Sequence, residues 1–495
     1  MRSGFSQVLK INSLLIEEVR IPVNKGRSNH IADLLLGLQS LYTMPDLSIK
    51  VEEILRQTVG TKRSSGKGST GMSLWEILVL SQLRLCLNIS YDEVMDLANH
   101  HYLVRGILGL EVTHGEHNRK QYSKSTIYDN LILLSDESLE QINAVVIELG
   151  HRVFKHNKKK DQALSLKTDS FVVESDTYFP TDYRHLYESG RKCNELIGKL
   201  SNQLAISGWR QWKDNIKKLK SAYRDFGRIT SSGGQNKQER QRQACNKLLE
   251  EGRKLSVKII NFKALAYHQC DEVNFTCLVQ VEWFHRMLEK HIDLLDRRIL
   301  QGESIPHQEK IFSIFQPYVE WINKGKRDVE IGKKLFVTTD QYDLILHYTI
   351  GYKQQDEAAF CAIVDQVKAT YELINSWSVD KGFSSKENKA LINVVYPDIN
   401  LIMSKKGKRN KDETAQETDK KFVKLRHKHN AIESNINELE HRGLNRCMDR
   451  SKVAFNKYVG LAVIAYNLHK IGRKLSKEMA IAKAREKEIK LLLAA

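Results

Sequence analysis

The sequence has 495 residues, of which 41% are hydrophobic and 28% are charged. This composition excludes a wholly disordered chain, and at about 150 residues per domain the length predicts roughly three domains. Lys and Arg outnumber Asp and Glu by 78 to 60, which gives a net charge of +18. A basic balance of this size indicates an anionic partner, most often nucleic acid and less often a membrane.

A membrane partner is disfavoured by the hydropathy of the chain. We find no run of about 18 or more apolar residues, and the N-terminus has no feature of a secretory signal. The 7 cysteines are scattered and form no C-x-x-C pair, which indicates a reducing compartment and disfavours a structural zinc site. We therefore expect a cytoplasmic protein without a membrane partner.

Residues 1–155 form a first zone that is predicted to be helical. Apolar residues recur at helical spacing from Leu74 to Leu85, and Ser90 and Glu93 have the spacing of a capping box that restarts a helix after a short break. Further helices are predicted over 123–134 and 135–154. Short helices joined by short turns fit a helix-turn-helix-like DNA-binding unit and fit a generic helical bundle equally well. The basic tract at 155–160 ends the zone.

The second zone opens with a strand and continues as helix. Alternating residues from Gln162 predict a strand that ends near Asp176. Residues 183–326 are predicted to be helical and rich in Lys, Arg and Gln, with a turn at 231–234. Trp209, Trp212 and Tyr223 lie among these basic residues. Such aromatic side chains can line a nucleic-acid groove, but at helical spacing they more often belong to a core.

The third zone returns to β structure. Residues 334–338 and 344–350 are predicted to form a hairpin with its turn at 340–343, followed by a helix over 355–373 and a strand over 374–379. Ser384 is predicted to cap a helix that runs to residue 391. Residues 394–396 and 401–403 are predicted to be extended, 405–418 to be a charged loop, and 419–440 and 454–474 to be helices.

Three carboxylates stand out in this order of elements. Asp169 lies in the first strand, Asp380 lies at the carboxyl end of a later strand, and Glu433 borders the apolar face of a late helix. Ligands of α/β sheets gather at the ends of strands. Each residue taken alone is more often a turn, cap or solvated residue. Neighbouring carboxylates compete for the same roles: Glu174, Asp176, Asp182, Asp340, Asp356, Glu438 and Glu440.

The segments around these carboxylates resemble the DDE transposases of bacterial insertion sequences. Residues 168–182 resemble the first-aspartate strand, 379–388 the second-aspartate motif, and 431–447 the glutamate helix. Residues 305–326 resemble the segment that leads into the second strand, 465–468 the closing helix, and 74–110 the N-terminal helical region. The resemblance covers most of residues 70–475.

The resemblance implies an α/β protein with an RNase H-like mixed sheet, a helical N-terminal domain and a large helical insertion after the first strand. The implied domains are a DNA-binding domain at 1–155, a catalytic domain at 156–182 with 331–475, the insertion at 183–330, and a basic C-terminal helix or tail at 476–495. The insertion is unusual for a simple RNase H-like core. It is expected either to dimerise or to grip the end of the transposon.

The resemblance also implies a metal-dependent reaction at Asp169, Asp380 and Glu433. Two Mg²⁺ or Mn²⁺ ions about 3.5–4 Å apart would stabilise the attacking and leaving oxygens of a phosphodiester. Asp169 would bridge the ions, and each of the other two carboxylates would complete one ion's ligands. The expected phosphate contacts come from six basic residues: Lys405, Lys406, Lys408, Arg426, Arg442 and Arg446. The family often has a Tyr and an Arg shortly before the glutamate, but this sequence has Arg426, His427 and His429 there.

The function expected from the resemblance is DNA transposition. The protein would bind terminal inverted repeats in double-stranded DNA, cut the DNA there and join the 3′ ends to a target, acting as a nucleoid-associated homodimer in the bacterial cytoplasm without a nucleotide cofactor. Two alternatives stay open: a non-catalytic or repurposed DNA-binding protein, and a metal-dependent nuclease without strand transfer.

Overall fold

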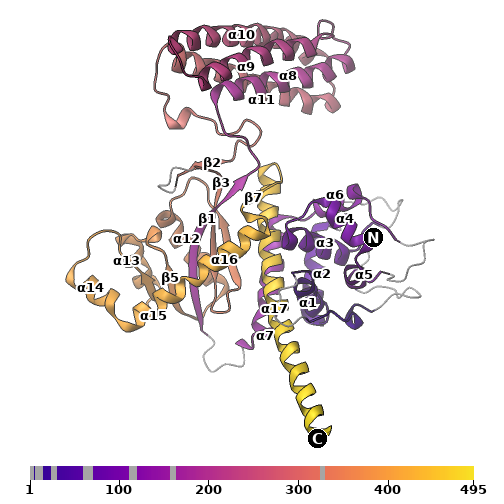
Figure 1. The fold of residues 1–495 in the computed structure, drawn as a ribbon, viewed down its shortest axis with the longest axis vertical. Coiled ribbons are helices and arrows are strands. Elements are labelled where there is room, and N and C mark those ends of the chain that lie inside the picture. Colours follow the sequence, from indigo (N-terminus) through magenta and orange to yellow (C-terminus); the bar gives the residue numbers. More distant parts are fainter. Residues whose placement is uncertain are drawn as a thin grey trace. The chain divides into compact units, whose positions relative to one another are not determined.

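The computed structural model describes residues 5, 15–23, 30–59, 71–110, 120–156, 163–323 and 329–494. The chain folds as two compact units, Met1–Asp176 together with Ile322–Ala495, and Thr177–Trp321. The protein is a mixed α/β protein in which helices predominate (Figure 1). Most of the predicted loop at 61–71, part of the basic tract at 155–160, and Lys324–Lys326 lie outside the described residues.

The N-terminal part of the first unit is helical, as its sequence predicts. Ser90 and Glu93 form the predicted capping box: the Ser90 Oγ accepts from the Glu93 backbone N–H at 3.3 Å, and the Glu93 carboxylate accepts from the Ser90 N–H at 2.8 Å. Asn88 ends the preceding helix in the left-handed conformation, with φ of 53°. The elements of this part are η1 (Ile16–Glu18), α1 (His30–Tyr42), α2 (Pro45–Val59), α3 (Leu74–Leu87), α4 (Tyr91–His100), α5 (Tyr102–Ile107), α6 (Lys124–Leu131) and α7 (Asp136–Val153).

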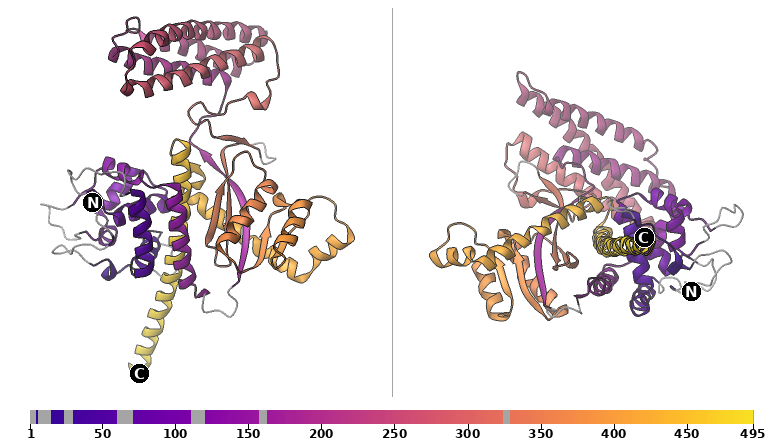
Figure 2. Two further views of the ribbon diagram at one scale, coloured as in Figure 1. Left: turned by 180° about the vertical axis from the view of Figure 1, so that it is seen from behind. Right: turned by 60° about the horizontal axis from the view of Figure 1, so that its bottom comes forward.

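The long C-terminal helix α17 (Lys452–Ala494) joins these helices to the sheet. Its first half packs against α1, α3 and α7 on one side and against β4 (Ile345–Ile350) on another. Figures 1 and 2 both show α17 running between the N-terminal helices and the sheet. The helices α1 and α17 cross closely at Gly37 and Gly472, where an added Cβ would lie 2.1 Å from the Leu468 carbonyl oxygen and 1.7 Å from the Asp33 carbonyl oxygen. This crossing therefore requires glycine at both positions.

The sheet is mixed, and its central strand β1 pairs along both edges. Among the described residues it has seven strands in the order β2-β3-β1-β5-β6, with β4 on β3 and β7 on β1. β1 is antiparallel to β3 and parallel to β5 and β7, and β5 is parallel to β6. The strands not yet bounded are β1 (Leu164–Ser175), β2 (Glu320–Ile322), β3 (Glu330–Thr339), β5 (Ile374–Val379), β6 (Asn400–Met403) and β7 (Arg446–Cys447).

Helices cover both faces of this sheet. On one face the Trp377 ring packs edge-on against Phe360 of α12 (Asp356–Thr370), and its Nε1 donates to the Thr168 hydroxyl at 2.8 Å. On the other face the helices α15 (Lys420–His429) and α16 (Ala431–Leu439) cross β5 and β1, as Figure 1 shows. Strand residues of alternate parity therefore face different helices.

Most predicted elements of the third zone are confirmed, and three details are wrong. The hairpin, the following helix and the strand at 374–379 form as predicted. The cap of α13 (Lys386–Val395) is Ser385, not Ser384, and residues 394 and 395 belong to this helix instead of being extended. The charged segment at 405–418 contains the helix α14 (Lys411–Thr418), which begins with a capping box between Asn410 and Glu413. The short η6 (Lys381–Phe383) and η7 (Glu440–Leu444) complete the zone.

The second unit is a helical bundle with its own core. Its elements are α8 (Asp182–Gln203), α9 (Trp212–Ser231), α10 (Lys237–Gln269), α11 (Glu272–Leu295), η4 (Asp296–Leu300) and η5 (His307–Glu309). The predicted turn at 231–234 separates α9 from α10. Trp209 is buried in the bundle core, and Trp212 and Tyr223 pack against that core. The aromatic residues of this zone therefore serve the core.

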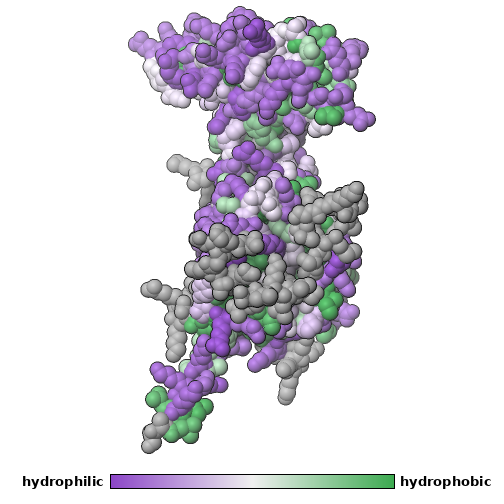
Figure 3. Space-filling model, turned by 90° about the vertical axis from the view of Figure 1, so that its right-hand side faces the viewer, coloured by the Kyte–Doolittle hydropathy of each residue, from purple (hydrophilic) through white to green (hydrophobic). Residues whose placement is uncertain are grey.

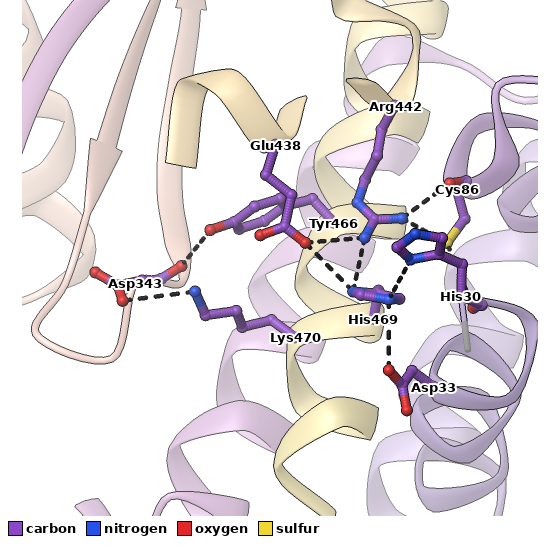
Figure 4. A network of polar contacts seen from close by, with 9 residues as sticks. All are labelled: His30, Asp33, Cys86, Asp343, Glu438, Arg442, Tyr466, His469 and Lys470. Carbon is purple, nitrogen blue, oxygen red and sulfur yellow. Dashed lines mark hydrogen bonds and ion pairs between the residues drawn. The ribbon is translucent and has the colours of Figure 1, made fainter. Parts of the chain in front are cut away.

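A buried polar network connects the end of α16 to α17, α1 and α3 (Figure 4). The Arg442 guanidinium donates to the Glu438 carboxylate at 2.9 Å, to the Cys86 carbonyl oxygen at 2.8 Å and to His469 Nδ1 at 2.8 Å. Because Arg is always a donor, Nδ1 of His469 is the acceptor and the ring proton lies on Nε2, which faces His30 Nδ1 at 3.2 Å.

This network changes the acid–base behaviour of its members. Burial, together with the nearby Arg442 charge, lowers the pKa of His469 to about 4, against the opposing effect of Glu438. Burial alone would raise the pKa of Glu438, but the hydrogen bond and the charge of Arg442 oppose burial, and the pKa lies far below its usual range. At neutral pH the network therefore contains a charged Arg442–Glu438 pair beside a neutral His469.

Removing Arg442 should destabilise the first unit strongly. The Arg442→Ala change leaves Glu438 and the Cys86 carbonyl oxygen without their donor, so we expect a loss of about 3–5 kcal/mol in the free energy of unfolding. Hydrogen exchange of the α17 amides measures this quantity within the unit. The control is Arg446→Ala, which breaks an ion pair whose arginine side chain is 47% exposed and should cost less than about 1 kcal/mol. Equal effects of the two substitutions would contradict this assignment.

Acid should weaken the same network through His469. Its folded pKa of about 4 lies below its unfolded value near 6.5, so the unfolded chain binds the proton first and stability falls as the pH drops from 6.5 toward 4. The contribution of His469 over this window is about 3 kcal/mol. The His469→Gln variant should show a correspondingly flatter dependence of unfolding free energy on pH than the native chain. An unchanged slope would mean that His469 does not titrate as described.

Candidate active site

Asp169 and Asp380 lie side by side on the sheet. The parallel pairing of β1 with β5 sets Lys167 opposite Ser378 and Thr168 opposite Val379, so the next residues, Asp169 and Asp380, are neighbours across the strands. Both have the parity of Lys167 and Ser378, which places them on the face that α15 and α16 cover. Asp169 is half-buried and Asp380 is exposed. The predicted pair of aspartates is thus brought together.

Glu433 lies on the helix that crosses the same face. It follows His429 by four residues, and the junction residue Asn430 keeps helical dihedral angles. His429 Nδ1 lies 3.1 Å from the hydroxyl of Ser378, which is two residues before Asp380. Glu433 itself is exposed, while its neighbour Ile432 is buried. The helix α16 therefore carries Glu433 on the face of the sheet that holds the aspartate pair, with its side chain exposed.

The three carboxylates do not form a ready metal cluster. In the part of the chain that the structure describes, no group of three or more His, Cys, Asp or Glu side chains is placed to hold a metal ion. The donor chemistry of the pair still suits magnesium, which prefers oxygen ligands and is commonly bound by one or two carboxylates together with substrate phosphates. Asp169 and Asp380 fit that pattern, and Glu433 stands outside it.

Two ion-paired residues fix the position of α16 over the sheet. Buried Lys167, two residues before Asp169, pairs with Asp343 at 2.7 Å, and Asn435 of α16 donates to the same Asp343 oxygen at 3.3 Å. Tyr466 and Lys470 of α17 also contact Asp343, as Figure 4 shows. Burial opposes the ionisation of Asp343, but its bond to Lys167 outweighs burial and lowers its pKa.

His429 is a site residue to which no specific role was assigned from the sequence. Burial lowers its pKa, and the neighbouring Asp380 carboxylate acts in the opposite direction. Its Nε2 is buried and has no hydrogen-bond partner among the described residues. Its place four residues before Glu433 was the available signal, since residues at this spacing share one face of a helix.

The competing carboxylates have other structural roles. Glu174 lies on the opposite face of β1, and Asp176 pairs with Arg446 and Arg450. Asp340 accepts from the backbone N–H groups of Tyr342 and Leu344, so it is the predicted turn residue. Three of the remaining four are bound to other residues: Asp182 pairs with Arg298, Asp356 binds Ser170 and Lys334, and Glu438 belongs to the buried network. The fourth, Glu440, begins η7.

One predicted phosphate contact is wrong. Arg442 is buried, and its guanidinium is bound to Glu438, Cys86 and His469, so it cannot reach DNA from this position. The sequence did not reveal this because a lone Arg at the end of a helix is usually exposed.

The other five predicted contacts stay at or near the surface. Arg426, Lys408 and Arg446 are exposed, and Arg446 pairs with Asp176. Lys405 binds Glu413 of α14, and Lys406 donates at 3.0 Å to the carbonyl oxygen of Gly382, two residues after Asp380. Lys406 is therefore the predicted basic residue that contacts the loop of the aspartate pair directly.

The comparisons with known proteins leave the family of this chain open. The chain matches no protein-family model, no curated protein and no solved structure. Among its described helices, none is both long enough and apolar enough to cross a membrane.

The loop that follows Asp380 should not tolerate a side chain at Gly382. A Cβ there would lie 2.7 Å from the Asp356 carboxylate, which the Ser170 hydroxyl and the Lys334 ammonium hold in place. We expect Gly382→Ala to lower the free energy of unfolding by about 1–3 kcal/mol, because an overpacked site must shift its neighbours. Thermal unfolding measures the change. Gly233→Ala, where an added Cβ meets no atom within 4 Å, should change stability by less than about 0.5 kcal/mol, and a similar loss in both variants would contradict the steric explanation.

Proposed function

We propose that this protein is a metal-dependent DNA strand-transferring enzyme of the DDE transposase type, with Asp169 and Asp380 as its principal metal ligands. The observation that carries the proposal is the register of β1 on β5, which sets these two aspartates side by side on one face of the sheet. Two adjacent carboxylates on rigid strands, open to solvent at Asp380, are what a magnesium ion shared with a phosphate requires.

The order of the strands supports the same proposal. Strands β4, β3 and β1 form an antiparallel series, and β5 and β6 continue it in parallel after helical connections. This order fits the RNase H-like catalytic core that the sequence motifs suggest. The unit Thr177–Trp321 then corresponds to a helical insertion that follows the first strand.

In this proposal the chain positions the substrate and supplies charge. Bound Mg²⁺ would activate the attacking oxygen and stabilise the leaving oxygen of the phosphodiester. Asp169 and Asp380 would hold the ion, and Lys406 and Arg446, at or near the surface of the same unit, would attract the phosphate backbone. Glu433 is the third carboxylate that the motifs suggest. It would supply a further oxygen ligand from the exposed side of α16.

A cleavage assay tests the proposal. The substrate is labelled duplex DNA that carries the inverted repeats flanking the coding region, incubated with Mg²⁺. We expect a nick at the repeat boundary that falls by about two orders of magnitude or more in Asp380→Asn, since the metal contributes several kcal/mol to the transition state. Glu174→Gln is the matched control, because it changes a carboxylate of the same strand on the opposite face.

Three other outcomes of the cleavage assay would contradict the proposal. Equal products from the native chain and Asp380→Asn would overturn the site. Binding of the repeats without a nick would favour a non-catalytic DNA-binding protein. Nicked products that never join a target would favour a nuclease.

A further inference from the structure

The outer face of α9 carries a row of cations. Lys213, Lys217, Lys220, Arg224 and Arg228 follow one another at spacings of three or four residues, so they share one face of the helix. All five are exposed. At about 1.5 Å per residue this row, the α9 stripe, extends over about 22 Å.

The opposite face of the same helix belongs to the bundle core. Leu219 and Phe226 are fully buried there, and Trp212, Ala222 and Tyr223 pack against that core. The stripe is therefore held on a rigid helix whose inner face is fixed by packing. Rigid presentation lowers the entropy lost when a ligand binds.

The stripe is poorly neutralised by the protein itself. The two acidic residues of α9, Asp214 and Asp225, lie off the stripe on its flank, and Asp225 pairs with Arg228 at 3.0 Å. Within the described residues Lys217, Lys220 and Arg224 form no ion pair. Several cations elsewhere in the bundle are paired, such as Arg191 with Glu188, Arg253 with Asp296, and Lys263 with Glu282.

A polar groove lies beside the stripe, between α9 and α10. It has a volume of about 510 Å³, and its charged lining residues are four cations, Lys218, Arg228, Arg240 and Lys247, and three carboxylates, Asp225, Glu250 and Glu251. The space-filling view shows hydrophilic residues over most of this bundle's visible face (Figure 3). The surface around the stripe is therefore polar, and its excess positive charge lies on the stripe and not in the groove.

We infer that the α9 stripe binds the phosphate backbone of double-stranded DNA. Duplex DNA carries one negative charge per about 1.7 Å of its axis, so a stripe of about 22 Å faces roughly a dozen phosphates. The expected contacts are to phosphates, which carry no base information, so the binding is independent of base sequence. This inference rests on the proposed function, to which it adds a second DNA-binding surface on the helical unit.

The test measures binding without catalysis. The full-length chain is titrated onto a labelled 20-base-pair duplex of arbitrary sequence in EDTA, at several salt concentrations, by fluorescence anisotropy. In Lys217→Ala/Lys220→Ala/Arg224→Ala, up to three phosphate contacts are lost. We expect the slope of log K against log salt to become shallower by up to about 2.7, with roughly 10²-fold weaker binding at 0.1 M salt.

Matched variants separate the stripe from overall charge. Arg286→Ala/Lys290→Ala/Arg298→Ala removes the same charge from α11 and η4, and α11 packs on α8 and α10. This control should keep the native slope. Lys217→Arg/Lys220→Arg/Arg224→Lys should also keep it, since the charges are retained.

Three results would overturn the inference: a native slope in the stripe variant, the same loss in the α11 control, or a loss of binding only to phosphatidylglycerol vesicles and not to the duplex. Because EDTA removes the metal, DNA binding is measured without cleavage, and its result does not depend on the cleavage assay. A native chain that binds through the stripe but never nicks DNA would refute the proposed function alone.

Discussion

The pairing of β1 along both of its edges is the constraint on which the rest of the structure depends. β1 pairs with β3 on one side and with β5 and β7 on the other. Its register is therefore fixed twice, and a slip of one residue would send every side chain to the opposite face. That register alone sets Asp169 beside Asp380 and turns both toward α15 and α16.

The helix that carries Glu433 is held over this pair by polar contacts at two points. Asn435 binds Asp343, which β1 and α17 also contact, and Glu438 binds Arg442 within the buried network. Burying an ion pair requires desolvation of both charges, so the pair by itself is poor evidence for stability. Removal of one partner, however, strongly lowers the free energy of unfolding. The network therefore specifies where α16 ends, and through α17 it makes the N-terminal helices part of the same unit as the sheet.

Basic side chains have different roles in the two units. In the first unit, basic side chains such as Arg84, Lys167 and Arg442 are buried in ion pairs that hold elements together. In the helical bundle, α9 exposes its cations in one row with little internal neutralisation. The basic residues behind the net charge of +18 therefore include buried ones that stabilise the first unit and exposed ones on α9 that are available for an anionic partner.

The sequence by itself determined the order of the longer strands of the sheet, the capping box of Ser90 and Glu93 and the two strand-associated aspartates, because hydrophobic periodicity and caps are local signals. It missed β2, β7 and the helix α14. It misjudged Arg442, and it assigned no role to Lys167 or His429 at the site. Only the tertiary structure decided these points. Burial of an ionisable side chain depends on partners hundreds of residues away, such as Cys86 for Arg442 and Asp343 for Lys167, and no local pattern records such partners. The placement of Glu433 outside a ready metal cluster was likewise set by packing, since the contacts of α16 fix its position over the sheet.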